Sequence, residues 1–97
     1  MFQPHTFSRL YTFFDEICAS LSIADKVIMA DVYAAREINT YGVTSRDVAQ
    51  KIGERASYGQ SLEQIKEMLL TELEVGDQLV IMGAGDIFKL FDIILEK

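Results

Sequence analysis

The chain has 97 residues, a formal net charge of -6 and an isoelectric point near 4.6. This length fits one small domain and leaves no room for a second. The acidic balance disfavours nucleic-acid binding through a basic face, and no apolar stretch approaches the ~20 residues needed to cross a bilayer. We therefore expect a cytosolic domain that binds neither nucleic acid nor membrane. The single cysteine, Cys18, excludes an internal disulfide and a cysteine-cluster metal site, and we expect it in the core.

The first segment predicts the end of a strand that turns into a helix. Pro4 fixes its own backbone and pushes Gln3 toward an extended conformation, while Ser8 can cap a helix that continues from Arg9. We expect that helix to extend to residue 21, because apolar side chains recur at helical spacing. These side chains are Leu10, Phe13, Phe14, Ile17 and Leu21.

The middle of the chain predicts a strand followed by two helices. Residues 26–33 contain a continuous apolar run rich in β-branched side chains, which is typical of a strand covered on both faces in a parallel sheet. Thr44 followed by Asp47, and Ser61 followed by Gln64, are capping patterns that predict the starts of two helices.

The last third predicts one more strand and one more helix. Residues 74–77 form a turn signal, and residues 78–82 predict a continuous apolar strand that stops at Gly83. A final helix is expected from Asp86, with an apolar face. Because strands and helices alternate, we predict an α/β fold: a three-layer, Rossmann-like parallel sheet with flanking helices.

Two full strands and a short segment at residues 1–3 would make a thin sheet, since sheets usually have about four to six strands. We therefore expect one domain over residues 1–97 whose sheet lacks something that should pair with it. Its unpaired sheet edge is a template for pairing, so we also expect the chain alone to self-associate or to fold only marginally.

Three polar segments should meet at one edge of this sheet, because all strands of a parallel sheet end there. The first carries His5 and Arg9. A guanidinium offers planar donors for a carboxylate or phosphate, and an imidazole titrates near neutral pH. The alternative is an ordinary surface role, in which Arg9 pairs with a carboxylate such as Asp15 and His5 caps a turn.

The second polar segment joins Tyr33 to Arg36 and Glu37 across two alanines. Small residues let another group approach the backbone, so this segment predicts the wall of a pocket. The alternative is a solvated loop with an incidental ion pair, because exposed pairs are common and contribute little.

The third polar segment is a glycine-rich turn that contains Gly83, Gly85 and Asp86. Its backbone amides can face an anion. It lacks the lysine followed by Ser or Thr of a nucleotide triphosphatase loop, and Phe88 replaces the third glycine of the dinucleotide fingerprint. Asp86 already balances the helix dipole, which disfavours phosphate. The turn fits a zwitterion better, with Asp86 for the ammonium group; a simple helix N-cap is the alternative for Asp86.

Together, three sequence motifs resemble the C-terminal domain of the UDP-N-acetylmuramate-L-alanine ligase family, a branch of the Mur ligases. They are FQPHTFSR at residues 2–9, DVYAARE at residues 31–37 and MGAGDIFKL at residues 82–90. The resemblance covers essentially the whole chain. It implies a domain that lacks its first strand and helix, because relatives carry both before the segment that begins at Gln3. In many relatives position 6 is an arginine that helps to hold the substrate, so Thr6 departs from the family there.

The resemblance implies a three-domain cytosolic enzyme of peptidoglycan synthesis, and thereby of cell-wall biogenesis, cell shape and cell division. Such an enzyme uses ATP and Mg²⁺ to join L-alanine to the lactyl carboxylate of UDP-N-acetylmuramate through an acyl phosphate. Its N-terminal domain holds the UDP sugar, its central domain holds ATP and metal, and its C-terminal domain closes over them. This chain has no phosphate loop and no magnesium carboxylate cluster, so we expect no cofactor and no ligation from it alone.

The resemblance also implies the site. His5 and Arg9 would border the alanine and the reacting phosphate, as catalytic and substrate-binding residues. The rest of the amino-acid pocket would come from Tyr33, Arg36, Glu37, Gly83, Gly85 and Asp86.

Two other functions stay open. The chain fits the sister ligase that attaches a tripeptide to the same sugar nucleotide, although Thr6 and Phe7 resemble Firmicute-type alanine enzymes. It also fits a stand-alone α/β module that binds a small ligand without catalysis, a reading that Met1 at its start favours. Such a module should bind its ligand at micromolar strength, whereas a ligase fragment should barely bind alanine.

Overall fold

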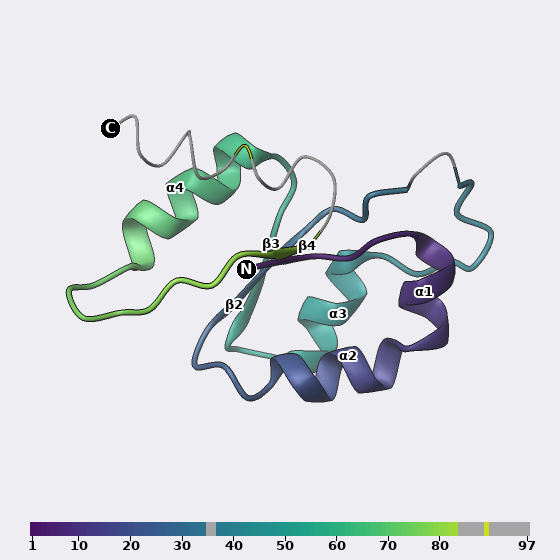
Figure 1. Cartoon of the computed structure of the whole chain (residues 1–97), viewed down its shortest axis with the longest axis horizontal. Helices are drawn as coiled ribbons and strands as arrows, with labels where there is room; N and C mark the ends of the chain where they lie inside the picture. The colour runs from purple at the N-terminus through teal and green to yellow at the C-terminus, as the bar shows by residue number, and fades with distance from the viewer. Residues whose placement is uncertain (35–36, 84–88, 90–97) are drawn as a thin grey trace.

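We describe the chain from a computed structural model, which covers residues 1–34, 37–83 and 89. Strands and helices alternate along most of this part, which confirms the predicted α/β class (Figure 1). In chain order the elements are β1 (Phe2–Gln3), α1 (Phe7–Thr12), α2 (Phe14–Leu21), β2 (Val27–Ala30), α3 (Ser45–Ile52), β3 (Ala56–Gly59), α4 (Leu62–Glu72) and β4 (Met82–Gly83).

The described strands form one parallel sheet with the order β3-β2-β1-β4. β2 and β3 pair along all four residues of each strand. β1 lies between β2 and β4, with Phe2 opposite both Met29 and Met82. The chain therefore moves outward from β1 to β3 and then returns to the other side of β1. In open α/β sheets such a reversal marks where ligands bind, beyond the carboxyl ends of the strands.

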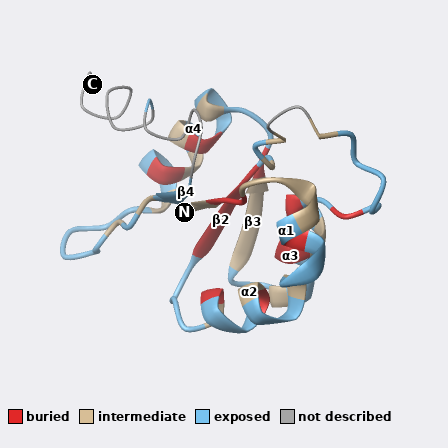
Figure 2. Cartoon of the chain, turned by 45° about the vertical axis from the view of Figure 1, so that its right-hand side comes forward, coloured by how far each residue is buried: buried red, intermediate tan, exposed pale blue. Residues whose placement is uncertain are grey.

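Helices cover both faces of the sheet and give the predicted three layers (Figure 1). Helices α1, α2 and α3 pack on one face and α4 packs on the other, and Figure 2 shows β2 buried between them. The first cluster buries Leu10, Cys18, Leu21, Val27, Met29, Val43, Val48 and Ala49. The second buries Ile28, Ala30, Ile65 and Leu69. Side chains of β2 point alternately into the two clusters, as expected for a strand covered on both faces. Cys18 is a core thiol, as predicted.

Helices α3 and α4 begin where the capping patterns predicted. The carboxylate of Asp47 accepts a hydrogen bond from the backbone N–H of Thr44 at 2.8 Å, as part of a capping box. The hydroxyl of Ser61 accepts from the backbone N–H of Gln64 at 3.1 Å. These bonds satisfy N–H groups that have no partner inside the helix. The predicted turn at residues 74–77 is also present, with a backbone hydrogen bond of 3.0 Å across it.

Two predictions about strands were wrong. Residues 56–59, for which no strand was predicted, form β3, so the described sheet has four strands instead of two and a short segment. Residues 78–82 were expected to form a buried strand, but β4 is only Met82–Gly83. The side chains of Val80 and Met82 are 56% and 45% exposed. β4 lies at the edge of the sheet and pairs only with β1. Because β1 has two residues, residues 78–81 have little neighbouring backbone with which to pair.

The single helix predicted over residues 8–21 is two helices with a break at Phe13. The backbone of Phe13 has φ -110° and ψ 21°, which leaves the helical conformation. Leu10 and Leu21 are buried as predicted, whereas the side chain of Phe13 is 50% exposed. The break allows Phe14 to pack against the core while Phe13 turns outward.

The predicted final helix, which starts at Asp86, lies outside the described residues. Among the helices of the described part, none has the length and apolar character required to cross a membrane.

Candidate functional site at the carboxyl edge of the sheet

The segments that follow β1 and β2 lie side by side at the carboxyl edge, as the topology predicted. The backbone of Thr6 donates to the carbonyl of Tyr33 at 2.8 Å, and the backbone of Tyr33 donates to the carbonyl of Pro4 at 2.8 Å. These bonds pair His5 with Tyr33 in a parallel bridge. The two rings stack, with centroids 5.6 Å apart and planes inclined by 19°. Tyr33 therefore packs against the ring of His5, but it is not among the described residues that line the pocket at this edge.

Arg9 reaches back toward His5 from the first helix. Its Nη1 lies 3.4 Å from Nδ1 of His5. A guanidinium can only donate, so Nδ1 is the acceptor in this contact. Asp15, the alternative partner of Arg9, instead lies 3.8 Å from the ammonium group of Lys51. The guanidinium carries five N–H donors, which leaves Arg9 able to bind a carboxylate or phosphate as well.

Helix α1 begins at Phe7 and is capped from two directions. The hydroxyl of Thr6 accepts from the backbone N–H of Arg9 at 3.4 Å, so the cap is Thr6 and not Ser8. The carboxylate of Glu37 accepts from the backbone N–H groups of Phe7 and Ser8 at 2.6 and 3.0 Å, and from the Ser8 hydroxyl. Ser8 is not the cap because α1 begins one residue before it, at Phe7. The hydrogen bond from the Ser8 hydroxyl, followed by those from the backbone, lowers the pKa of the Glu37 carboxyl.

Thr6 holds the strained backbone of the site. Its φ of 66° is positive in a residue with a side chain, a conformation that costs on the order of 1–3 kcal/mol. Two hydrogen bonds hold Thr6 in this conformation. Its backbone N–H donates to the carbonyl of Tyr33, and its hydroxyl accepts from the backbone N–H of Arg9. The strained residue turns the chain between β1 and α1, and this turn brings Arg9 back to His5.

Gly83 belongs to the third predicted segment and lies next to the first. It pairs with Gln3, and a Cβ at this position would sit 2.6 Å from the Gln3 carbonyl oxygen. Glycine is therefore needed for β4 to approach β1. Three other predicted site residues, Arg36, Gly85 and Asp86, lie outside the described residues.

A pocket of about 320 Å³ opens where the strand order reverses. The described residues that line it are Phe2, Gln3, Pro4, His5, Arg9, Leu10, Phe13, Ile17 and Gly83. Most of its wall is apolar, and His5 and Arg9 supply the titratable and charged groups. A small apolar pocket with few polar groups is typical of a site for a small molecule.

Gln3 was not predicted as a site residue. Its side chain is buried, and its Oε1 has no hydrogen-bond partner among the described residues. A buried acceptor without a donor costs about 1–3 kcal/mol, and such groups are rare in native structures. The sequence shows only that a glutamine in a strand precedes the Pro-His pair. This pattern does not distinguish a glutamine of the site from one with a structural role.

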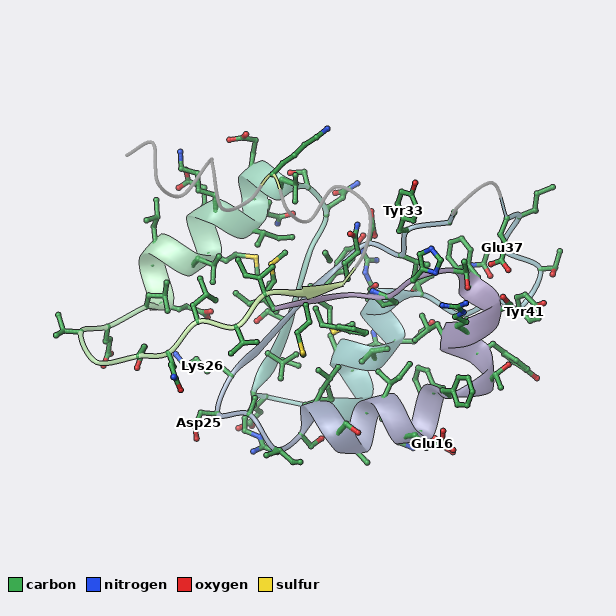
Figure 3. The ribbon with its side chains drawn as sticks, viewed as in Figure 1. Glu16, Asp25, Lys26, Tyr33, Glu37 and Tyr41 are labelled. Carbon is green, nitrogen blue, oxygen red and sulfur yellow. The ribbon has the colours of Figure 1, made fainter. Side chains whose placement is uncertain are left out.

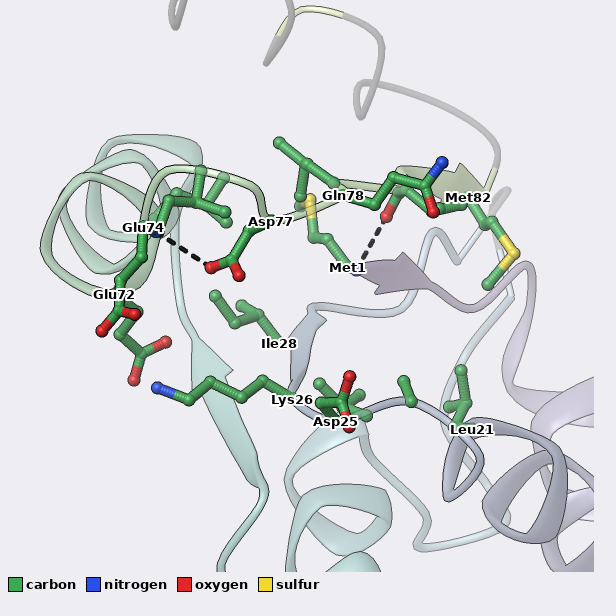
Figure 4. Close-up of a pocket in the computed structure, with 16 residues that line it drawn as sticks. Met1, Leu21, Asp25, Lys26, Ile28, Glu72, Glu74, Asp77, Gln78 and Met82 are labelled. Carbon is green, nitrogen blue, oxygen red and sulfur yellow. Dashed lines mark hydrogen bonds between the residues drawn. The ribbon is translucent and has the colours of Figure 1, made fainter.

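A larger hollow of about 440 Å³ lies at the amino edge of the sheet (Figure 4). Dashed lines in Figure 4 mark its hydrogen bonds from the Met1 amine to the carbonyl of Val80 and from the backbone of Glu74 to the carboxylate of Asp77, both 2.9 Å. Its lining includes the acidic side chains Asp25, Glu72, Glu74 and Asp77 and the basic side chain Lys26. We place the candidate site at the carboxyl edge instead, because the loops beyond that edge carry His5 and Arg9.

The described part of the site does not fit a metal ion. No group of three or more His, Cys, Asp or Glu side chains that could hold one is found in residues 1–34, 37–83 and 89. The guanidinium of Arg9 repels a cation and suits an anionic group. The arrangement is thus suited to bind a carboxylate or phosphate and to move a proton at His5.

The reversed strand order and the histidine, arginine and tyrosine at that point define a Rossmann-like α/β domain with a polar site at the carboxyl edge of its sheet. No family model matches the chain. Its whole sequence is nevertheless related to one segment of the UDP-N-acetylmuramate-L-alanine ligases, which confirms the resemblance.

The proteins of that name from Caldicellulosiruptor saccharolyticus and Caldicellulosiruptor bescii are 47% and 49% identical to this chain over 100 aligned residues. The protein of that name from Lachnospira eligens is 44% identical over 99 residues. These alignments include 99% or more of this chain, and the chain spans 22% of the length of each relative.

Proposed function

We propose that this chain is the C-terminal, closing domain of an ATP-dependent cytosolic ligase that joins L-alanine to UDP-N-acetylmuramate in peptidoglycan biosynthesis. The names of the relatives support this activity for the full-length protein. The single observation that supports a role for this domain in it is the His5–Arg9–Tyr33 group at the strand-order reversal. It offers donors for the carboxylate of an amino acid or for a phosphate.

In this proposal, His5 and Arg9 border the alanine and the reacting phosphate. Arg9 binds oxygen atoms of the carboxylate or phosphate, since a planar guanidinium matches both groups. His5 accepts from Arg9 at Nδ1, so its other ring nitrogen is the one that can exchange a proton with the substrate. Tyr33 holds the imidazole ring by stacking. Predicted contacts from Arg36, Gly85 and Asp86 belong to the same proposal.

In this proposal, ATP and Mg²⁺ would be held mainly by the central domain that the resemblance implies, outside this segment. ATP supplies the phosphoryl group that activates the lactyl carboxylate. The described residues contribute a histidine and an arginine rather than a metal-binding set. We propose that closure of this domain over the other two completes the active site and excludes water, as closing domains commonly do.

The test is an assay of the full-length protein for ADP release with UDP-N-acetylmuramate and either L-alanine or an alanyl-glutamyl-diaminopimelate tripeptide. Release that depends on L-alanine supports the proposal. Release that depends on the tripeptide assigns the chain to the sister ligase. If the protein releases no ADP with either acceptor, and this chain alone binds an amino acid at micromolar concentration, the binding-module function replaces both ligase functions.

We also propose that the 97-residue chain alone self-associates. β3 and β4 are the edge strands of the described sheet, and a free strand edge can pair with that of another copy. Sedimentation velocity should therefore show an average mass that rises with protein concentration. A concentration-independent monomer with a sharp two-state melting transition would contradict the proposal.

A further inference from the structure

The carboxylate of Glu37 is hydrogen-bonded to the first turn of α1, which lies 29 and 30 residues earlier in the chain. Its Oε1 accepts from the backbone N–H of Phe7 at 2.6 Å and from that of Ser8 at 3.0 Å. Its Oε2 accepts from the hydroxyl of Ser8. Both carboxylate oxygens are thus engaged by one short piece of chain, and Figure 3 shows Glu37 beside the start of that helix.

Phe7 and Ser8, which donate hydrogen bonds to Glu37, lie in the chain between His5 and Arg9. The loop that carries Glu37 is hydrogen-bonded to this segment a second time, at Tyr33. The backbone of Tyr33 donates to the carbonyl of Pro4 and accepts from the N–H of Thr6, on either side of His5. Two attachments to one segment fix both ends of the turn on which His5 and Arg9 lie.

The geometry of the contact is that of a helix cap. A carboxylate at a helix start is favoured by the N–H groups and by the helix dipole, and charged hydrogen bonds of this kind are stronger than neutral ones. Three donors already occupy the Glu37 carboxylate. An ammonium group of an incoming amino acid would have to compete with them, so the role of direct ligand is a poor match to this arrangement.

We propose that Glu37 is a positioning residue that sets the relative placement of His5 and Arg9 through the backbone of Phe7 and Ser8, and that it does not bind the amino acid itself. This inference rests on the proposed ligase function. The contact that it preserves is the 3.4 Å approach of Arg9 Nη1 to His5 Nδ1.

Two substitutions in the full-length protein separate positioning from ligand binding. Glu37→Ala removes all three hydrogen bonds, whereas Glu37→Gln keeps the shape and can still accept from the two N–H groups. Positioning predicts that Glu37→Ala lowers kcat by about 10- to 100-fold, because small misplacements of reacting groups cost that much. The KM for L-alanine should change much less, and Glu37→Gln should recover most of kcat. Glu54→Ala, which removes an exposed carboxylate in the turn after α3, is the control and should match the wild type.

A ligand role for Glu37 predicts a different pattern. Both Glu37→Ala and Glu37→Gln would then raise the KM for L-alanine alike, because each removes the negative charge that pairs with the ammonium group. That result would overturn the proposal. Ser8→Ala gives a further check: added to Glu37→Ala, it should cause little extra loss, since the two side chains act through one shared contact.

Amide hydrogen exchange of the full-length protein tests the contact without relying on activity. Exchange at Phe7 and Ser8 should be faster in Glu37→Ala, close to wild type in Glu37→Gln and unchanged in Glu54→Ala. Unchanged exchange in Glu37→Ala would overturn the positioning role. If the wild type shows no ligase activity while exchange at Phe7 and Ser8 responds as expected, the proposed function fails and the contact itself stands.

Discussion

Gly83 is the position at which the contact between β1 and β4 leaves no room for a side chain. In Gly83→Ala, the new Cβ would lie 2.6 Å from the Gln3 carbonyl oxygen and 2.9 Å from the Gln3 Cβ, at a φ of 142°. These Gln3 atoms are backbone or attached to it, so they cannot rotate away. The backbone strain costs about 1–3 kcal/mol and the overpacking about 1–3 kcal/mol. The substitution should therefore cost about 2–6 kcal/mol in total if β4 stays in place.

β4 can escape most of this cost, because it is a two-residue edge strand. We therefore expect Gly83→Ala to undock β4 locally before it unfolds the domain. The reporter is the Met82 N–H, which donates to the carbonyl of Met1 at 3.0 Å. A local cost of about 2 kcal/mol should accelerate its hydrogen exchange roughly 30-fold.

Gly42→Ala is the matched control for Gly83→Ala. Gly42 also has a positive φ, of 68°, but a Cβ there would meet nothing within 4 Å. Its substitution should cost only the backbone strain, about 1–2 kcal/mol, and should leave exchange at Met82 unchanged. Equal protection of the Met82 N–H in Gly83→Ala and in the wild type would refute the steric reasoning.

Leu10 is fully buried in the larger core cluster, so Leu10→Ala should lower the free energy of unfolding by about 2–5 kcal/mol in a urea titration; no measurable change would mean that α1 does not pack on the sheet. Burial, followed by the hydrogen bond to Asp31, raises the pKa of Tyr58 to about 12. The folded state thus favours the neutral phenol, and stability should fall as pH rises from about 10 toward this value. Absorbance titration should show Tyr58 ionising at lower pH in Asp31→Asn, and an unchanged curve would contradict the assigned cause. Hydrogen bonds from Ser8 lower the pKa of Glu37, so its contribution to stability is present above the ordinary glutamate pKa of about 4.3 and is lost as pH falls below it. Denaturant titrations should show a shallower acid loss of stability in Glu37→Gln, and an unaltered slope would count against the contact.

Some local sequence signals predicted their elements well, whereas the apolar run at residues 78–82 did not, because β4 is only Met82–Gly83. The apolar run predicted as a strand over residues 26–33 identified β2, although the strand itself is only Val27–Ala30. The pairs Thr44–Asp47 and Ser61–Gln64 located two helix starts, because a cap involves only neighbours along the chain. β3 was missed because its sequence, Ala-Ser-Tyr-Gly, has no apolar run. It is a strand through its pairing with β2, which is a contact between distant residues that propensity does not encode.

The meeting of the first two polar segments was predictable, whereas their contacts with each other were not. Parallel strands end at one edge whatever their order, so the meeting of His5 and Tyr33 followed from the fold class. The partners of individual polar groups depend on loop conformation. The carboxylate of Glu37 accepts hydrogen bonds from Phe7 and Ser8, and the cap of α1 is Thr6 instead of Ser8 because the helix begins at Phe7.

The break at Phe13 was also hidden from the sequence. Apolar side chains at helical spacing continue from α1 into α2, and periodicity alone does not show where one helix ends when the next has the same period. The structure shows the interruption only through the backbone angles of Phe13 and the exposure of its ring.

The most direct test of the proposed site is the steady-state kinetics of Arg9→Ala in the full-length protein, measured as ADP release against L-alanine concentration. Arg55→Ala is the matched control, because Arg55 contacts the carbonyl of Ala24 at the opposite edge of the sheet. We predict that Arg9→Ala lowers kcat/KM for L-alanine by about 100-fold, the loss typical of a donor aimed at developing charge, and that Arg55→Ala behaves as wild type. A value of kcat/KM for Arg9→Ala equal to that of Arg55→Ala would contradict the placement of the alanine and phosphate at this edge.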